Sequence, residues 1–227
     1  MENFLHYNEI ARAIRLLCQS SVLLSEDTDG TDQISVGSNR LFTVGDQVEL
    51  IDDEMPAENY EISGLVGLTK IQLNSAVSGQ FTVAKNAVVR LAEPVLDDLH
   101  WVGQGRPLVM PQPAELEMPA IIVEPAILDQ PMGEGTNKSV RQDYHFRIYY
   151  LERPAAGSRR NEAFLERVSK LFSLLSRDIY LGGTCWYAQI IRLDPDASVQ
   201  QHLAQHGLNV DVAEIELIAR YLQTIPG

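Results

Sequence analysis

The strongest constraint on the fold comes from residues 144–177, where the spacing of the apolar side chains changes abruptly. Tyr144, Phe146, Ile148 and Tyr150 alternate with other side chains, and this period of two predicts a strand over 144–151. From 159 to 177 the apolar side chains recur at every third or fourth position, which predicts a long helix. A strand followed by an amphipathic helix predicts a sheet with a helix covering one face.

A second helix is predicted near the N-terminus, over residues 3–19. Its apolar stripe consists of Phe4, Tyr7, Ala11, Ile14 and Cys18. Residues 25–32 have no periodicity and are rich in Asp, Thr and Gly, so they predict a loop or linker.

Between residues 42 and 91 the period is two, and several short strands are predicted. They lie around 48–50, 60–62, 70–73 and 88–91, with Gly, Asp, Asn and Ser at the turns between them. Short strands in so short a segment predict a small β-barrel, because closing a sheet removes its exposed edges.

The rest of the chain supplies shorter elements. In chain order they are a short helix at 95–101, a Gly- and Pro-rich connector at 103–113, a buried strand at 120–123, a polar loop at 129–138, a strand at 184–191, a short helix at 198–206 and a strand at 211–222. The last segment also fits a helix, since Val212, Ile215, Ala219 and Leu222 would share one helical face.

These elements predict an α+β protein with an antiparallel or mixed sheet flanked by helices and an inserted small β-barrel module. The predicted division places 1–24 and 94–227 in the α+β domain and 25–93 in the inserted module. This order of elements limits the possible architectures, because the long helix must cover one face of the sheet.

Charge is distributed unevenly along the chain, whose formal net charge is −13. Residues 41–100 hold three basic and ten acidic side chains, whereas residues 137–178 hold nine basic and five acidic ones. Such a chain should be repelled by nucleic acid and by anionic membranes. Complementary acidic and basic faces would suit head-to-tail contact between copies, with two ordinary solvated surfaces as the alternative.

The two cysteines, Cys18 and Cys185, do not form a disulfide framework and predict buried free thiols. The first residues lack the basic-then-apolar layout of a signal peptide, and no apolar run is long enough to cross a bilayer. We therefore expect a protein that is soluble and cytosolic when made.

Catalytic, cofactor-binding and metal-binding motifs are not found in the sequence, so we predict none of these sites. His202 and His206 share a helical spacing but lack the Glu and the third ligand of a zinc site. The acidic cluster Asp52-Asp53-Glu54 with Glu58 lacks the spacing of a calcium loop.

Two glycine motifs and one aromatic strand have weak functional interpretations. Gly103-Gln104-Gly105 lacks the third glycine of a dinucleotide loop, and Gly182-Gly183 follows a helix, which favours a helix stop. The aromatic strand at 144–150 would suit base stacking, but the acidic composition favours a strand packed under the helix.

The C-terminal layout resembles that of tail terminator and tail-completion proteins of long-tailed bacteriophages. The resemblance rests on Pro-Ala-Ile-Ile-Val at 119–123, the polar loop, the strand at 144–151, the helix, and Leu181-Gly182-Gly183-Thr184 before the next strand. The helix at 3–19 would supply the N-terminal helix of that family. The resemblance covers residues 1–20 and 114–222, through short motifs and the order of elements.

The resemblance implies a non-enzymatic virion protein, made in the host cytoplasm, without cofactors or membrane partners. Such proteins form a ring, usually a hexamer, that ends tail-tube polymerisation and joins the tail to the head-side connector. The implied partners are copies of itself, the tail tube protein and a head-side connector or stopper protein. DNA would pass through the lumen without specific binding.

Residues 25–93 depart from the family, whose members are usually compact single domains. This departure leaves a head-closure or connector protein of the neck as an alternative. A cytosolic ligand- or peptide-binding module that works through the barrel is a second alternative, and an enzyme with a dispersed site is a third.

Overall fold

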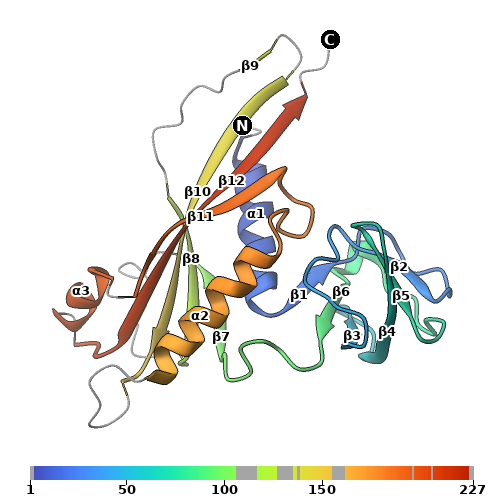
Figure 1. The fold of residues 1–227 in the computed structure, drawn as a ribbon, viewed down its shortest axis with the longest axis horizontal. Helices are drawn as coiled ribbons and strands as arrows, with labels where there is room; N and C mark the ends of the chain where they lie inside the picture. The colour runs from blue at the N-terminus through green and yellow to red at the C-terminus, as the bar shows by residue number, and fades with distance from the viewer. Residues whose placement is uncertain are drawn as a thin grey trace.

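A computed structural model describes residues 3–105, 117–126, 135–136, 139–154, 162–195, 197–205 and 207–224. It is a mixed α+β structure with two curled sheets (Figure 1). The N-terminal sheet contains strands β1 to β6, and the C-terminal sheet contains strands β7 to β12. This confirms the α+β class, whereas the predicted domain division stays a prediction.

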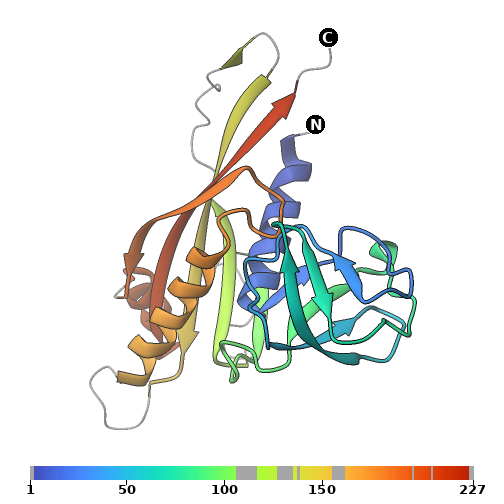
Figure 2. The same ribbon diagram turned by 45° about the vertical axis from the view of Figure 1, so that its right-hand side comes forward.

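The N-terminal sheet is antiparallel throughout and curls into a half-barrel (Figure 2). Its strand order is β1-β6-β3-β4-β5-β2, with β1 at Ser21–Leu23, β2 at Gln33–Ser35, β3 at Gln47–Ile51, β4 at Glu58–Val66, β5 at Lys70–Leu73 and β6 at Val88–Leu91. A single bridge between Leu24 and Val36 joins the continuations of the two edge strands. The alternating side chains Val48, Leu50 and Ile71 are fully buried, as the period of two predicts.

The C-terminal sheet has the order β11-β12-β10-β8-β7, and β9 also pairs with β10. Its strands are β7 (Trp101–Gln104), β8 (Ala120–Ala126), β9 (Gly135–Thr136), β10 (Ser139–Glu152), β11 (Tyr187–Asp194) and β12 (Asp211–Thr224). All pairs are antiparallel except β7 with β8, so the sheet is mixed. The strand alternative for 211–222 is confirmed.

Two helices cover the same face of the C-terminal sheet. Helix α1 (Asn3–Cys18) places Tyr7 edge-on to Tyr144, and helix α2 (Glu162–Arg177) places Phe164 beside Tyr150. Tyr144 and Tyr150 lie on the same side of β10, because residues separated by an even number share a face. The Tyr7 hydroxyl also donates hydrogen bonds to the Ala126 and His145 carbonyls, at 2.9 and 3.3 Å.

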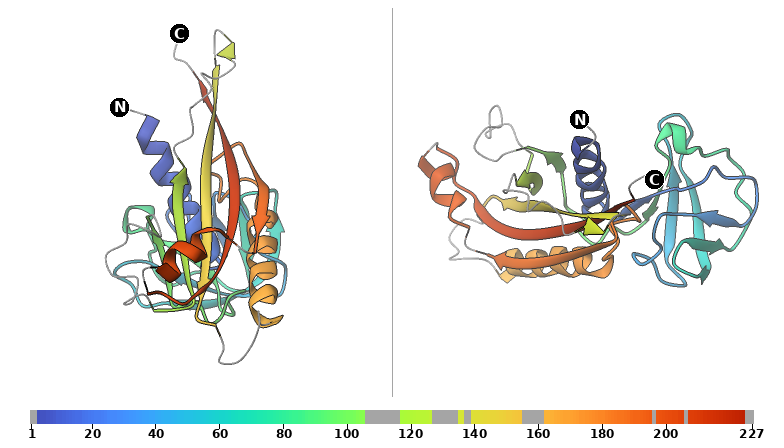
Figure 3. Two further views of the ribbon diagram at one scale, coloured as in Figure 1. Left: turned by 90° about the vertical axis from the view of Figure 1, so that its left-hand side faces the viewer. Right: turned by 90° about the horizontal axis from the view of Figure 1, so that it is seen from above.

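Both predicted long helices are confirmed, with shifted ends. The α2 stripe Phe164, Val168, Leu171 and Leu175 is buried, whereas residues 159–161 lie outside the described part of the chain. A third helix, α3 (Val199–Gln205), covers one end of the opposite face through Leu203 and matches the short helix predicted at 198–206. Figure 3 shows the long pair β10 and β12 extending past the N-terminal end of α1.

The helix predicted at 95–101 is wrong. This segment forms bends and a turn, and Trp101 begins β7. The Val95 amide donates to Ser20 Oγ at 2.9 Å, and the His100 amide donates to the Pro119 carbonyl at 3.0 Å. These amides are therefore used by other segments and cannot form a helical ladder.

Other boundaries also differ from the predictions. Strands β1 and β2 were not predicted, because three residues are too few to establish a period. The predicted connector at 103–113 begins inside β7, and its residues from 106 onward lie outside the described part. Of the polar loop at 129–138, only Gly135–Thr136 is described, as β9.

The two sheets are joined by a close contact between two turns. The Gly37 backbone lies so near Gly182 and Gly183 that a Cβ built on Gly37 would be 1.8 Å from the Gly182 oxygen. Gly182 and Gly183 have φ values of +65° and +83°, which favour glycine. Beside them, buried Asp178 accepts hydrogen bonds from Ser38 Oγ and from the Gly182 amide, at 2.9 and 2.8 Å. We call this contact the intersheet clasp.

Gly37→Ala should destabilise the protein by about 2 kcal/mol or more, because the new methyl group must push the two turns apart. The matched control is Gly64→Ala, whose Cβ would lie 3.4 Å from Gln72 Cβ, an ordinary contact. Urea unfolding followed by circular dichroism measures both. Equal unfolding midpoints for the two variants would contradict this prediction, because they would show that the two turns can move apart without loss of stability.

Candidate functional site

The acidic cluster near residue 52 serves local structure. Asp52 Oδ1 accepts hydrogen bonds from the Glu54 and Met55 amides at 2.9 and 2.6 Å. Asp53 accepts a hydrogen bond from Asn86, and Glu54 pairs with Lys85 at 2.5 Å. Within the described ranges, no group of three or more His, Cys, Asp or Glu side chains is arranged to hold a metal.

The remaining motifs of the sequence analysis are dispersed. The side chain of His202 and all of His206 lie outside the described part of the chain. Gly103 lies in edge strand β7, where the Trp101 indole occupies the space beside it, so a Cβ there would be 1.8 Å from the ring. The side chains of Tyr144 and Phe146 are buried under α1.

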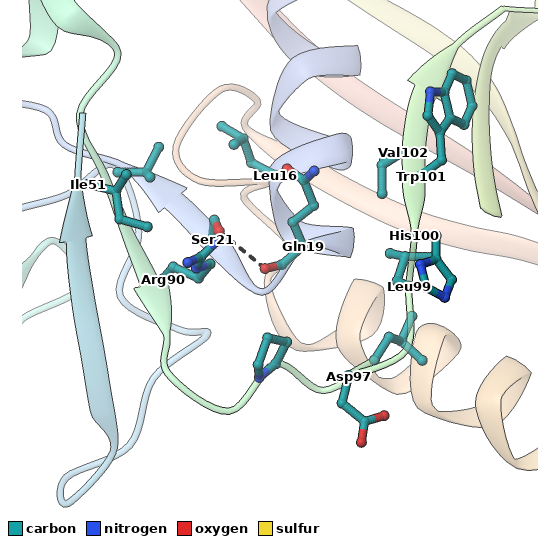
Figure 4. Close-up of a pocket in the computed structure, with 13 residues that line it drawn as sticks. Leu16, Gln19, Ser21, Ile51, Arg90, Asp97, Leu99, His100, Trp101 and Val102 are labelled. Atoms are coloured by element: carbon teal, nitrogen blue, oxygen red, sulfur yellow. Dashed lines mark hydrogen bonds between the residues drawn. The ribbon is translucent and has the colours of Figure 1, made fainter. Parts of the chain in front are cut away.

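A groove of about 290 Å³ separates the two sheets. Figure 4 shows Ser21, Arg90 and Ile51 on the wall formed by the N-terminal sheet, and His100, Trp101 and Val102 on the other wall. Arg90 is bound by Glu49 at 2.5 Å. Of the ionisable lining groups, Arg90 lies on one wall, whereas Asp97 and His100 belong to the same segment on the other. The Ser21 hydroxyl in the lining donates to the Gln19 carbonyl at 3.2 Å, so it is not paired with His100 as a nucleophile and base.

An ion-pair ladder crosses the face of the C-terminal sheet that lies opposite α1 and α2. It consists of Arg141, Asp143, Arg147, Arg192, Asp194, Glu214, Glu216 and Arg220. Arg147 lies 3.7 Å from Glu214 and 4.0 Å from Glu216. Cross-strand register explains the pairing, since Arg147 lies opposite Glu216 and Asp143 opposite Arg220.

The environments of two ladder carboxylates differ. The hydrogen bond from Arg141 lowers the pKa of Asp143, although burial opposes this shift. Burial raises the pKa of Glu214, although Arg147 opposes that change. The ladder is therefore a set of mutually paired charges on a sheet face, and its geometry supports a structural or contact role more than acid–base chemistry.

Among the described residues of the C-terminal half, the large apolar side chains with the highest exposure lie on α2 and at or beside β11. Leu165 and Phe172 of α2 are 43% and 37% exposed, and Trp186, Ile191 and Leu193, at or beside β11, are 60%, 48% and 39% exposed. Helix α2 packs beside β11, which is an edge strand of the sheet. We call these five residues the α2–β11 flank.

The flank was not identified from the sequence. In residues 184–191 apolar side chains occupy both sets of alternating positions. This pattern could have indicated a strand with apolar side chains on both faces. A bulge between Ile190 and Arg192 then turns Ile191 outward. Pairing and bulge position depend on the tertiary fold, so local periodicity does not reveal them.

The acidic and basic segments of the chain meet within a single copy. Arg167 of the basic segment lies 2.6 Å from Asp98 of the acidic segment and 2.6 Å from Glu152. Arg177 donates a hydrogen bond to the Leu41 carbonyl at 3.0 Å. Contact between these segments across a subunit boundary stays a prediction.

Cys18 and Cys185 are both free and buried, as predicted. Burial raises the pKa of each thiol to about 12, so neither is a reactive thiolate at neutral pH. Among the helices that the structure describes, none is long and apolar enough to span a bilayer.

A scan against models of known protein families and a search of curated proteins both find no match for this chain.

Asp143→Asn should lower the free energy of unfolding by about 1 kcal/mol at pH 7, because the Asp143 side chain is only 17% exposed and bound to Arg141. Its folded pKa is depressed, so the stabilisation is present above the unfolded pKa of about 3.9 and is lost as the pH falls through the folded pKa. Urea unfolding of the wild type and the variant between pH 7 and pH 2 should show that their free energies of unfolding converge as the pH falls. The control is exposed Glu166→Gln, and a difference that is constant with pH would contradict the assignment.

Proposed function

We propose that this chain is a virion structural protein that forms a ring at the neck of a long-tailed bacteriophage. As a tail terminator it would end tail-tube polymerisation and join the tail to the head-side connector. The proposal carries with it a tail-terminator-like α+β domain of residues 1–24 and 94–227 and an inserted small barrel at 25–93. It also carries the partners that the resemblance implies, namely other copies, the tail tube protein and a connector or stopper protein.

The observation that carries the proposal is the packing of α1 on the C-terminal sheet. Tyr7 contacts β8 and β10 although more than a hundred residues separate it from them in the chain. The N-terminal helix, the sheet and α2 thus form one body, the arrangement that the family resemblance requires. An N-terminal helix packed on the N-terminal sheet alone would have removed this support.

The α2–β11 flank supplies a second argument. Exposed apolar side chains concentrated on one helix and one edge strand are typical of protein contact surfaces. A ring subunit needs such a lateral surface. The groove between the sheets, by contrast, lacks the convergent ionisable groups that an enzyme would need.

The purified protein should form a discrete oligomer, and the double variant Ile191→Ser/Leu193→Ser should weaken it. Loss of two half-exposed aliphatic side chains from a contact costs about 2 kcal/mol, or about 30-fold in the dissociation constant. Sedimentation velocity over a range of concentrations measures this. Gln189→Ser, an exposed change on the same strand, should leave assembly unchanged. A wild-type protein that stays monomeric at all concentrations and salts would refute the ring.

Termination itself is tested on growing tubes. The wild-type chain, added to polymerising tail tube protein of the same phage, should stop growth and give short tubes in negative-stain electron micrographs. The Ile191→Ser/Leu193→Ser variant should stop growth less effectively, because fewer complete rings form. Tubes that lengthen at the same rate with and without the wild-type chain would argue against a terminator and favour the head-closure alternative.

A further inference from the structure

One end of the N-terminal sheet carries a cluster of exposed apolar side chains. Val44, Val66 and Leu68 are 62%, 50% and 49% exposed. Val66 ends β4 and Leu68 lies in the turn to β5, and the loop that holds Val44 begins beside this turn, because the Asn39 amide donates to the Leu68 carbonyl at 2.8 Å. Solvated aliphatic side chains gathered at one end of a sheet gain free energy when a partner covers them.

This end is also basic, although the sheet as a whole is acidic. Residues 21–91 contain four basic and eleven acidic side chains. Arg40, which lies over the Tyr180 ring, and Lys70, which donates to Gln33 Oε1 at 3.2 Å, are exposed at the apolar end. Asp46 lies in the loop of Val44 and is bound to Thr43, so two basic groups face one acidic group there. The other two basic side chains, Lys85 and Arg90, are paired with Glu54 and Glu49. We call Arg40, Val44, Val66, Leu68 and Lys70 the basic end.

The opposite end of the sheet has the complementary character. Asp53 and Glu54 are exposed there beside Val83, which is 44% exposed. The Val83 amide donates to Asp27 Oδ1 at 2.7 Å, and the Asp53 amide donates to the Lys85 carbonyl at 3.1 Å, so these loops are adjacent. The Lys85–Glu54 pair is solvent-exposed and leaves the end with a negative balance. We call Asp27, Asp53, Glu54 and Val83 the acidic end.

The two ends cannot meet within one copy. Strand β3 runs between them, with Val44 before its first residue and Asp53 after its last. Its five residues span about 17 Å of extended chain. A contact between the basic end and the acidic end must therefore join different copies, and it is head-to-tail, the type that builds rings.

We propose that the basic end of one copy binds the acidic end of the next copy, so that the N-terminal sheets brace neighbouring subunits. Both ends carry exposed apolar side chains, and their net charges are opposite in sign. The intersheet clasp holds each N-terminal sheet against its own C-terminal sheet, so the brace acts on the whole subunit. This inference rests on the proposed ring and assigns residues 25–93 a role within it.

Charge reversal tests the brace, with two variants of the full chain. One is Arg40→Glu/Lys70→Glu, and the other is Asp53→Lys/Glu54→Lys. Each variant alone brings like charges together and should weaken assembly at least about tenfold in sedimentation velocity. An equimolar mixture of the two should recover wild-type assembly, because each reversed end then meets a partner of opposite sign. Circular dichroism checks that both variants are folded.

The control Glu9→Lys/Glu93→Lys makes the same net-charge change as the acidic-end variant at exposed positions that belong to neither the α2–β11 flank, the basic end nor the acidic end, and it should assemble like the wild type. Two variants that assemble normally beside an oligomeric wild type would overturn the brace and leave the ring intact. A mixture that assembles no better than its components would also overturn it. A monomeric wild type would overturn both proposals.

Discussion

The backbone contact between Gly37 and the Gly182-Gly183 turn determines how the two halves of this protein are joined. It brings main chain against main chain, so no side chain can take part without forcing the turns apart. Gly182 and Gly183 both have positive φ values. Asp178 is buried beside this turn, where it accepts hydrogen bonds from the Gly182 and Tyr180 amides and from the Ser38 hydroxyl. A buried carboxylate without these donors would destabilise the fold, so the clasp and the approach of the sheets depend on each other.

Helix α1 makes the second connection between the halves. Its first turns pack on β10 through Tyr7, whereas its C-terminal end leads through Ser20 directly into β1 of the N-terminal sheet. Ser20 has a φ of +56°, and its hydroxyl oxygen accepts a hydrogen bond from the Val95 amide, where the chain leaves the N-terminal sheet. The N-terminal sheet is thus held at its entrance, at its exit and at the clasp, and three such restraints resist hinge motion better than a single linker would.

Local periodicity predicted the elements whose burial follows one face. The stripe of α2 and the alternation of β10 need no knowledge of partners, because each reports only which side of an element avoids water. Strands β1 and β2 were missed, since each has only three residues. The segment at 95–101 is not a helix because its amides bind Ser20 and Pro119, and partners so distant in the chain leave no local pattern in the sequence.

The candidate contact surfaces could not be predicted for a related reason. The α2–β11 flank exists because β11 is the edge of the sheet, and strand order depends on pairings between segments that are distant in the chain. The glycines at 182–183 predicted an end to the helix, yet their second role needs Gly37, which comes from the other sheet. Sequence patterns report burial along one element, whereas a surface between elements depends on the whole topology.

The form of β11 also constrains how copies can meet. An exposed edge strand offers unpaired backbone groups to another strand, but a bulge and an exposed charge both hinder that pairing. Strand β11 has a bulge between Ile190 and Arg192, and the Arg192 side chain is 58% exposed. Pairing of a neighbour's strand with the half of β11 that follows the bulge is therefore disfavoured. The exposed side chains of Ile191 and Leu193 can still contact a neighbouring copy. A contact through side chains stops at a defined partner surface, whereas open-ended strand pairing would favour uncontrolled aggregation, so this edge suits a closed assembly of fixed size.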